Sequence, residues 1–208
     1  WPMLTTALLA DGSLYKFAHT SYGQVKTISR YAPQVANPST TSLCAPNVTT
    51  GCDYRLLSYT TYNLPSTDDP NNNAAQSDCP RFTSRFDWAF EWNAGVTTSF
   101  SSASDNSWGQ VTTADGTISR EYYNLAATNS EWWKDGLPYK TELYAAGQTP
   151  GSSTPKKTTL TTWENHTTWG ARIANTTVTD GENNSSRYSV LQYTGSYNLL
   201  ADMFTYKG

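Results

Sequence analysis

The strongest constraint on this sequence is a series of closely spaced turn signals separated by short alternating segments. Gly follows a turn residue at positions 11–12, 22–23, 115–116, 135–136 and 180–181. Gly adopts the positive φ angles that tight hairpin turns require. Between the turns, side chains alternate in character, so that Tyr15, Phe17 and His19 share one face of an extended segment. The pattern predicts an all-β chain, an antiparallel sheet of stacked hairpins with few or no helices.

Further segments show the alternation expected of strands, and others are typical of loops. Strands are predicted at residues 14–19, 54–62, 111–113, 117–123, 140–144, 157–163, 175–179 and 187–193, and loops at 32–51, 65–80 and 147–155. A length of 208 residues suits a single β-rich domain, residues 1–208. The Gly/Ser/Thr/Pro-rich loop at 147–155 is the place where two lobes would divide.

Composition excludes several classes of protein. Charged residues make up 15% and the formal net charge is −3, so the chain lacks the basic patch of a nucleic-acid-binding protein. No apolar run is long enough for a membrane-spanning helix, and we expect no membrane insertion. Aromatic residues reach 13%, too many for a disordered tail. The 32 Thr, together with abundant Tyr and Trp, favour strands.

Three cysteines bear on the compartment. Cys44 and Cys52 bracket a short Pro- and Gly-containing loop whose ends can meet, and a disulfide there would stabilise the fold by about 2–3 kcal/mol. Three pairings are open, and we prefer Cys44 with Cys52, which leaves Cys79 as a buried thiol or as a link between chains. The alternative is three reduced thiols in a cytosolic protein. The sequence contains no CxxC pair and no histidine cluster to support a metal site.

Glycosylation sequons favour export. Five N-x-[ST] sequons lie in polar segments, at Asn47, Asn165, Asn175, Asn183 and Asn184. Several are expected by chance in a chain so rich in Asn, Ser and Thr. The chain begins at Trp1 without a basic and apolar leader, which suggests a mature form or an excised piece. We therefore expect an extracellular or cell-surface location.

The chain also repeats a short unit. The short repeat consists of an aromatic–Thr pair, a turn with Gly or Asn, and an apolar residue. It recurs at residues 19–25, 59–64 and 193–199, and in the first copy the pair is His19-Thr20. A single hairpin is barely stable in water, so repeated hairpins must stack on their neighbours. The repetition indicates a scaffold more than a catalyst.

At these repeats the chain resembles a known family. Residues 12–25, GSLYKFAHTSYGQV, resemble the YD repeat of RHS-type proteins, and weaker copies fall at 59–60, 144–145 and 193–194. Segments of long bacterial RHS proteins are similar to LLSYTTYNLP, SWGQVTTADGTISREYY, WWKDGLPYKTELY and NTTVTDG. Together these segments cover about half of the chain. Each copy lacks the Asp of the Tyr-Asp pair, with His19-Thr20 in its place in the first copy.

The resemblance implies a wide sheet of stacked hairpins, as in bacterial surface proteins, toxin shells and teneurin-like adhesins. A chain of 208 residues cannot close such a shell, so it would be a segment of one or a subunit of another assembly. Such a sheet leaves edges that a further chain can pair with. Head-to-tail pairing of edges that does not close builds a fibre.

Catalytic motifs are missing from the sequence. It contains no nucleophile elbow, phosphate-binding loop or HExxH motif, and we interpret His19 as a sheet residue and His166 as an exposed loop residue. A glycoside hydrolase needs two carboxylates that flank the scissile bond. The candidates beside aromatic residues are Asp87, Glu91, Glu121 and Glu131, and we expect them to end strands or face water. The sequence thus predicts a protein that is not an enzyme and uses no cofactor.

Two close pairs of tryptophans are the candidates for an interface or a sugar-stacking platform. They are Trp88 with Trp92 and Trp132 with Trp133. Such rings fill a core, form a subunit interface or bind sugar. If residues 132–133 lay in a strand, their side chains would point to opposite faces, and both could not be core in a one-sided sheet.

These features together predict an extracellular structural protein, a segment or subunit of a self-associating surface assembly or filament. Its partners would be copies of itself or a larger parent chain, and glycans in addition. The first alternative is a non-catalytic carbohydrate-binding or adhesion module. The second is a fragment of a cargo-encapsulating RHS toxin shell.

Overall fold

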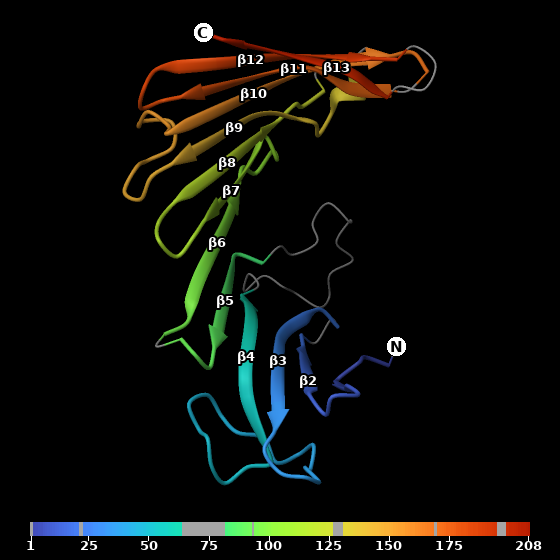
Figure 1. Ribbon diagram of the computed structural model, residues 1–208, viewed down its shortest axis with the longest axis vertical. Coiled ribbons are helices and arrows are strands. Elements are labelled where there is room, and N and C mark those ends of the chain that lie inside the picture. The colour runs from blue at the N-terminus through green and yellow to red at the C-terminus, as the bar shows by residue number, and fades with distance from the viewer. Residues whose placement is uncertain are drawn as a thin grey trace. The chain divides into compact units, whose positions relative to one another are not determined.

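The computed structural model describes residues 2–20, 23–63, 82–92, 94–126, 131–168, 170–194 and 199–208 (Figure 1). These described residues form an antiparallel meander of 13 strands in which each strand neighbours the next in sequence. Within the described ranges the only helical element is one 3₁₀ turn, η2 (Trp132–Lys134). The predicted all-β class, an antiparallel sheet of stacked hairpins, is confirmed.

Contacts divide the chain into two compact units, Trp1–Ser99 and Phe100–Gly208. The first unit holds β1 (Thr6–Leu8), β2 (Leu14–His19), β3 (Val25–Pro33), β4 (Tyr54–Asn63), β5 (Ser84–Ala89) and the start of β6 (Val96–Ser102). The second holds β7 (Trp108–Thr112), β8 (Ile118–Tyr123), β9 (Pro138–Tyr144), β10 (Lys157–His166), β11 (Gly170–Asp180), β12 (Ser185–Tyr193) and β13 (Leu200–Lys207). The loop at 147–155 lies within the second unit.

The predicted strands coincide with observed ones. Each of the eight predicted segments overlaps a strand, and the mismatches are confined to the ends. The predicted loop at 32–51 is a loop beyond Pro33, where β3 ends, with one isolated bridge from Leu43 to Tyr54. The predicted loop at 65–80 lies outside the described residues.

Several hairpin turns share one local design, in which an Asp carboxylate accepts the backbone N–H of the residue two positions later. The backbone N–H of Ser13 donates to Asp11 at 2.9 Å, that of Ser107 to Asp105 at 3.0 Å, and that of Thr117 to Asp115 at 3.0 Å. The residue between them has a positive φ angle: 81° at Gly12, 62° at Asn106 and 85° at Gly116. The pKa of all three carboxyls is lowered by hydrogen bonds: from the side chain and backbone of Ser13 to Asp11, from the backbone and side chain of Ser107 to Asp105, and from the Thr113 side chain and then Thr117 to Asp115. The Asp therefore closes the turn, and Gly or Asn supplies the left-handed conformation.

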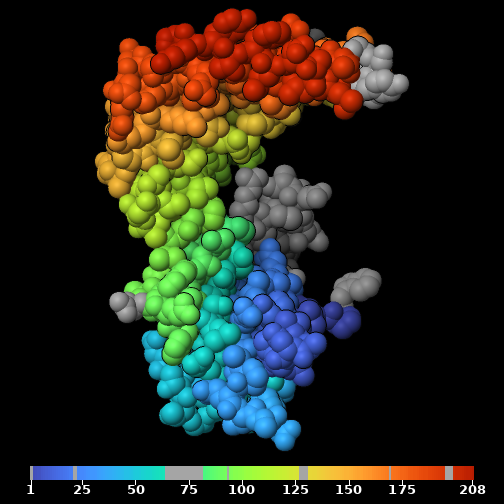
Figure 2. Space-filling view, in the orientation of Figure 1, coloured from blue at the N-terminus to red at the C-terminus, as the bar shows by residue number. Residues whose placement is uncertain are grey.

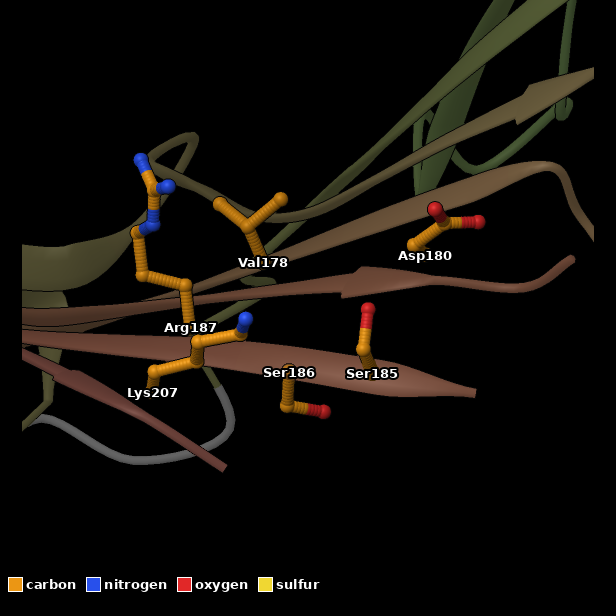
Figure 3. A pocket seen from close by; sticks show the side chains of 6 residues that line it. All are labelled: Val178, Asp180, Ser185, Ser186, Arg187 and Lys207. Atoms are coloured by element: carbon orange, nitrogen blue, oxygen red, sulfur yellow. The ribbon is translucent and has the colours of Figure 1, made fainter. Parts of the chain in front are cut away.

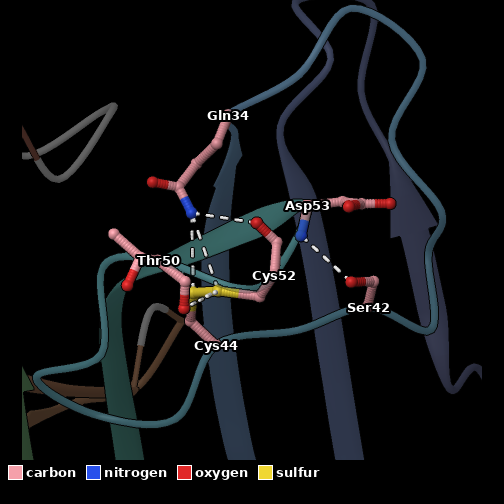
Figure 4. Close-up of a disulfide and its surroundings, with 6 residues drawn as sticks. All are labelled: Gln34, Ser42, Cys44, Thr50, Cys52 and Asp53. Atoms are coloured by element: carbon pink, nitrogen blue, oxygen red, sulfur yellow. Dashed lines mark hydrogen bonds between the residues drawn. A yellow bond between two sulfur atoms is a disulfide. The ribbon is translucent and has the colours of Figure 1, made fainter.

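The first unit buries a small core around β2 and β4. Leu14, Tyr54 and Leu56 are buried there, as is Cys44 in the loop that follows β3. A disulfide joins Cys44 to Cys52 across a Cα–Cα distance of 5.4 Å (Figure 4). The predicted pairing is confirmed.

Polar contacts hold the disulfide loop against the start of β4. The side-chain amide of Gln34 donates to the backbone oxygen of Cys52 at 3.2 Å, and the backbone N–H of Asp53 donates to Ser42 Oγ at 3.1 Å (Figure 4). The backbone N–H of Cys44 donates to the carbonyl of Tyr54 at 2.8 Å. The loop is thus tied to the strand whose first residue, Tyr54, is among the most buried side chains.

The second unit has almost no conventional core. Among its described residues, Tyr144 is the only large side chain that is buried. Its strands lie side by side in one curved layer (Figure 1). A sheet that lacks a second layer must draw its stability from contacts between neighbouring strands.

Cations lie over aromatic rings in the second unit. Arg120 lies over Trp108 at 4.1 Å, and the Lys140 ammonium lies 3.9 Å from the centre of the Tyr122 ring. These residues belong to the adjacent strands β7, β8 and β9. The aliphatic stems of Arg and Lys cover apolar ring surface while their charged ends stay near water. Such pairs partly replace the second layer that this sheet lacks.

Candidate interaction surfaces

The two candidate tryptophans of the first unit, Trp88 and Trp92, differ in exposure. Trp88 lies in β5, is 5% exposed, and its ring lies 5.6 Å from that of Tyr59 on β4 in a stacked arrangement. Trp92 follows β5 and is 44% exposed. Trp88 therefore packs within the unit, and only Trp92 presents a ring to solvent.

The two candidate tryptophans of the second unit, Trp132 and Trp133, lie on a turn between β8 and β9. Trp132 and Trp133 begin η2, so the rule that adjacent strand residues point to opposite faces does not apply to them. Trp132 is 73% exposed, whereas Trp133 is half-buried. The neighbouring Glu131 accepts a 2.6 Å ion-paired hydrogen bond from Lys134 across the turn. Trp132 is the most exposed large apolar side chain that the structure describes.

Four of the five sequon asparagines are exposed. Asn47 lies in the disulfide loop with a φ angle of 64°, Asn165 lies near the end of β10, and Asn183 and Asn184 form the turn between β11 and β12. Asn175 is half-buried and lies within β11, which is paired on both sides. A bulky glycan needs a surface position, which favours the four exposed asparagines as acceptors.

The carboxylates considered for glycoside hydrolysis are mostly engaged with neighbouring side chains. Asp87 accepts hydrogen bonds from Thr60 and Arg85, both at 2.7 Å. Glu121 accepts one from the phenol of Tyr123 at 2.7 Å, and Glu131 is paired with Lys134 as described. Glu91 is exposed in the turn after β5.

The histidines are each part of a hairpin. His19 is the last residue of β2, is half-buried, and is paired with Val25 of β3. His166 is the last residue of β10, and its Nδ1 accepts the backbone N–H of Thr168 at 3.2 Å. His19 is thus a sheet residue, as predicted, whereas the prediction that His166 is an exposed loop residue is wrong, because it is half-buried and paired with Gly170 at the end of β10.

A polar network in the second unit was not predicted from the sequence. Glu142 of β9 accepts hydrogen bonds on one carboxylate oxygen from the phenols of Tyr122 at 2.7 Å and Tyr144 at 2.6 Å. Its other oxygen lies 3.0 Å from the Lys140 ammonium. Lys140, Glu142 and Tyr144 alternate along one strand, which is the only sequence signal for the network.

The network shifts the titration of its members. Burial raises the pKa of Glu142, but the hydrogen bonds from Tyr144, Tyr122 and Lys140 outweigh burial, so the pKa lies below its usual value. Burial and the hydrogen bond to Glu142 raise the pKa of Tyr144 to about 12, and the same two causes raise that of Tyr122. The arrangement keeps the carboxylate ionised and both phenols protonated, which suits a structural anchor.

A shallow hollow lies on the face of β11, β12 and β13. It has a volume of about 190 Å³, and the residues around it are Val178, Asp180, Ser185, Ser186, Arg187 and Lys207 (Figure 3). Arg187 and Lys207 are paired across β12 and β13. Asp180 already accepts the backbone N–H of Glu182 at 2.9 Å in the following turn. Small-molecule sites usually measure about 300–1,000 Å³, so this hollow is too small to enclose such a ligand.

The outermost strand, β13, is exposed along its whole length. All eight residues from Leu200 to Lys207 are exposed, and the C-terminal residues, coloured red, lie at the surface in Figure 2. Among the described residues, β13 pairs with β12. The exposed fractions include 62% for Met203, 44% for Phe204 and 57% for Tyr206. The strand therefore presents apolar side chains to solvent along its length.

Within the described residues, no group of three or more His, Cys, Asp and Glu side chains is placed to hold a metal ion. A search of the same residues finds no helix with the length and apolar character to cross a membrane.

Comparison with models of known protein families finds none that matches this chain, and comparison with curated proteins likewise finds no match.

Proposed function

We propose that the protein is an extracellular structural element, a segment or subunit of an assembly that forms by association between β-sheets. The observation that carries this proposal is β13, an eight-residue strand that is exposed throughout and that pairs, among the described residues, with β12 alone. Natural proteins usually blunt such edges with prolines, bulges or several charges, because an unpaired edge is a template for another strand. β13 contains no proline and two charged residues, Asp202 and Lys207, and its one irregularity is the register shift at Ala201 in its pairing with β12.

The architecture behind the edge supports the same proposal. The second unit has few buried side chains, so its stability depends on pairing between adjacent strands. Charged residues make up only 15% of the chain, and therefore little electrostatic repulsion opposes close approach of two copies. The RHS-like hairpin units fit a protein whose role is to extend a sheet.

An extracellular location agrees with two features. The Cys44–Cys52 disulfide is of a kind that persists in oxidising compartments and is rare in the cytosol. Four sequon asparagines lie at exposed positions, where an exported chain can carry glycans.

Association can be measured directly on the purified protein. Sedimentation velocity over a wide concentration range is expected to show a shift from monomer to larger species, and electron microscopy of concentrated material is expected to show ordered assemblies. A chain that stays monomeric at all concentrations in both measurements contradicts the proposal.

A carbohydrate-binding module is the second candidate, favoured by the exposure of Trp132. A ring that is 73% exposed on a fixed turn resembles the platforms that stack on sugar faces. Glycan-array binding that is lost in Trp132→Ala, in a protein with an unchanged unfolding curve, would support this function. Trp92→Ala is a matched control, because this tryptophan is also exposed but lies in the other unit. Equal binding by wild type and Trp132→Ala would dismiss it.

A further inference from the structure

We propose that the hollow on β11, β12 and β13 is a binding site for a tetrahedral oxyanion, sulfate or phosphate, either free or as an ester group on a larger molecule. The hollow has a volume of about 190 Å³, and two of the side chains around it, Arg187 and Lys207, are cations. The inference does not depend on self-association, since the site lies within a single chain. It follows from the register of the three strands, from the charges that this register brings together and from the size of the hollow.

The strand register places the two cations on one face of the sheet. Lys207 of β13 is paired with Arg187 of β12, and Arg187 is paired with Val178 of β11. Two positions away along each of these two inner strands, Asp180 of β11 is paired with Ser185 of β12. Side chains alternate between the faces of a strand, so these five residues share one face. Figure 3 shows Asp180 at one end of the hollow, with Arg187 and Lys207 toward the other.

The two cations have no anionic partner of their own. Arg187 and Lys207 lie directly opposite each other, an arrangement of like charges that destabilises a sheet. Both are exposed, and among the described residues neither forms an ion pair or a side-chain hydrogen bond. A bound anion would contact both and remove the repulsion between them.

The acidic residue of the hollow is engaged in the turn that follows β11. One carboxylate oxygen of Asp180 accepts the backbone N–H of Glu182 at 2.9 Å, and the other accepts the side-chain amide of Asn183 at 2.7 Å. The hydrogen bonds from Asn183 and Glu182 hold the pKa of Asp180 below its usual value. Asp180 is therefore an ionised carboxylate that the turn itself holds in place, rather than a partner for Arg187 or Lys207.

Positive charge exceeds negative charge around the hollow. The turn between β11 and β12 and the strand ends beside it carry four cations and two carboxylates, which are Lys156, Lys157, Arg187, Lys207, Asp180 and Glu182. The local excess is thus two positive charges, in a chain whose formal net charge is −3. This excess is opposite in sign to the charge of the whole chain and favours an anionic ligand.

Sulfate and phosphate match the site in charge, shape and size. Sulfate carries two negative charges and phosphate nearly two, which balance the local excess, whereas a carboxylate balances only half of it. The planar guanidinium of Arg187 can bind two oxygens at once, and Lys207 supplies a point charge. The hydroxyl of Ser185 makes no hydrogen bond to any described residue and can donate to a third oxygen. Drug-sized ligands need about 300 Å³ or more, but an oxyanion is much smaller.

Titration with inorganic sulfate tests the site on the full chain. Sulfate stabilises proteins in general because it is excluded from their surface, so binding should be measured by residue-specific NMR shifts at constant ionic strength, with chloride as the replaced anion. We expect saturable shifts of the backbone amides of Ser185, Arg187 and Lys207. Shifts that never saturate, or that do not involve these amides, would overturn the proposal.

Substitution of either cation should weaken sulfate binding. Arg187→Gln and Lys207→Gln each remove a charge-assisted contact and should raise the dissociation constant about tenfold or more. Lys26→Gln is the matched control, because Lys26 is an exposed cation without an ion pair among the described residues and lies on β3 of the first unit. The control should leave the dissociation constant unchanged, and equal values for wild type and Arg187→Gln would refute the site.

Two further measurements separate a binding role from a structural one and identify the source of the anion. Without sulfate, Arg187→Gln should keep or slightly raise the melting temperature, since it removes one of two like charges, and a clear fall would assign the arginine a structural role instead. Galactose 6-sulfate that binds more tightly than inorganic sulfate would indicate an ester on a glycan, and weaker binding would indicate the free anion. Equal binding by unsulfated galactose at these amides would contradict an oxyanion site.

Discussion

Replacing Tyr144 by phenylalanine tests how the second unit is held together without a second layer. Tyr144 is 1% exposed, and its phenol donates a 2.6 Å hydrogen bond to the Glu142 carboxylate. Tyr144→Phe keeps the ring and removes only this donor. Glu142 retains its contacts with Tyr122 and Lys140, so the carboxylate does not become an unpaired buried charge.

The expected loss of stability is about 2 kcal/mol at neutral pH. A hydrogen bond to a charged group contributes about 1.5–3 kcal/mol. The pKa of Tyr144 points in the same direction, because burial and the bond to Glu142 raise it from 10.0 to about 12.

The effect of the substitution should depend on pH in both directions. The pKa of Glu142 is lowered in the folded state, so its stabilising contribution is present above the ordinary value of 4.5 and is lost as pH falls below it. The pKa of Tyr144 is raised, so its contribution is present below pH 10 and is lost as pH rises toward about 12. The difference between wild type and Tyr144→Phe is therefore largest between about pH 5 and pH 10.

Urea unfolding with tryptophan fluorescence measures the difference, and hydrogen exchange at β9 amides assigns it to this unit. Tyr139→Phe is the matched control, because Tyr139 lies in the same strand, is 38% exposed, and its hydroxyl makes no hydrogen bond to any described residue. We expect the control to change stability by less than about 0.5 kcal/mol. Equal unfolding midpoints for the two variants, or a cost that is independent of pH from 3 to 11, would refute the reasoning.

Two further predictions concern local constraints in the chain. Cys52→Ser opens a loop of sequence separation 8 and should lower the unfolding free energy by about 2.5 kcal/mol, measured against wild type with the disulfide confirmed by mass; no change would show that the loop gains nothing from closure. Gly116→Ala should cost about 1–2 kcal/mol, because φ is +85° and the new Cβ would lie 3.0 Å from the Cβ of Ala146. Gly109→Ala in β7 is its control, since its nearest contact is an ordinary 3.8 Å, and equal melting temperatures for the two variants would contradict the turn argument.

The sequence predicted strands best where one face of the sheet is more buried than the other. β4 alternates because Tyr54 and Leu56 point into the core, and the alternation was visible in the sequence. β13 was not predicted, although it is eight residues long. Its apolar and polar residues do not alternate, because neither face is buried and nothing selects a period of two. A strand of this kind can be found only from its hydrogen bonds.

The sequence showed which residues could take part in interactions, but not which of their side chains would be exposed or in contact with one another. The Cys44–Cys52 bridge was predicted because its loop is short and both ends are local in sequence. The different exposures of Trp88 and Trp92 depend on a partner strand that no local pattern reveals. The Glu142 network depends on the register between two strands, which places the phenol of Tyr122 beside Glu142.

The architecture of the second unit explains why its edge is the place to look for a partner. In a two-layered protein an edge strand is held by its neighbour and by the layer beneath it, whereas strands of a single layer have only their neighbours. Each inner strand has two neighbours, and β13 has one, β12. Among the described strands of the unit, β13 therefore has the least support, and a further strand beside it would give it the two-sided pairing that the inner strands have.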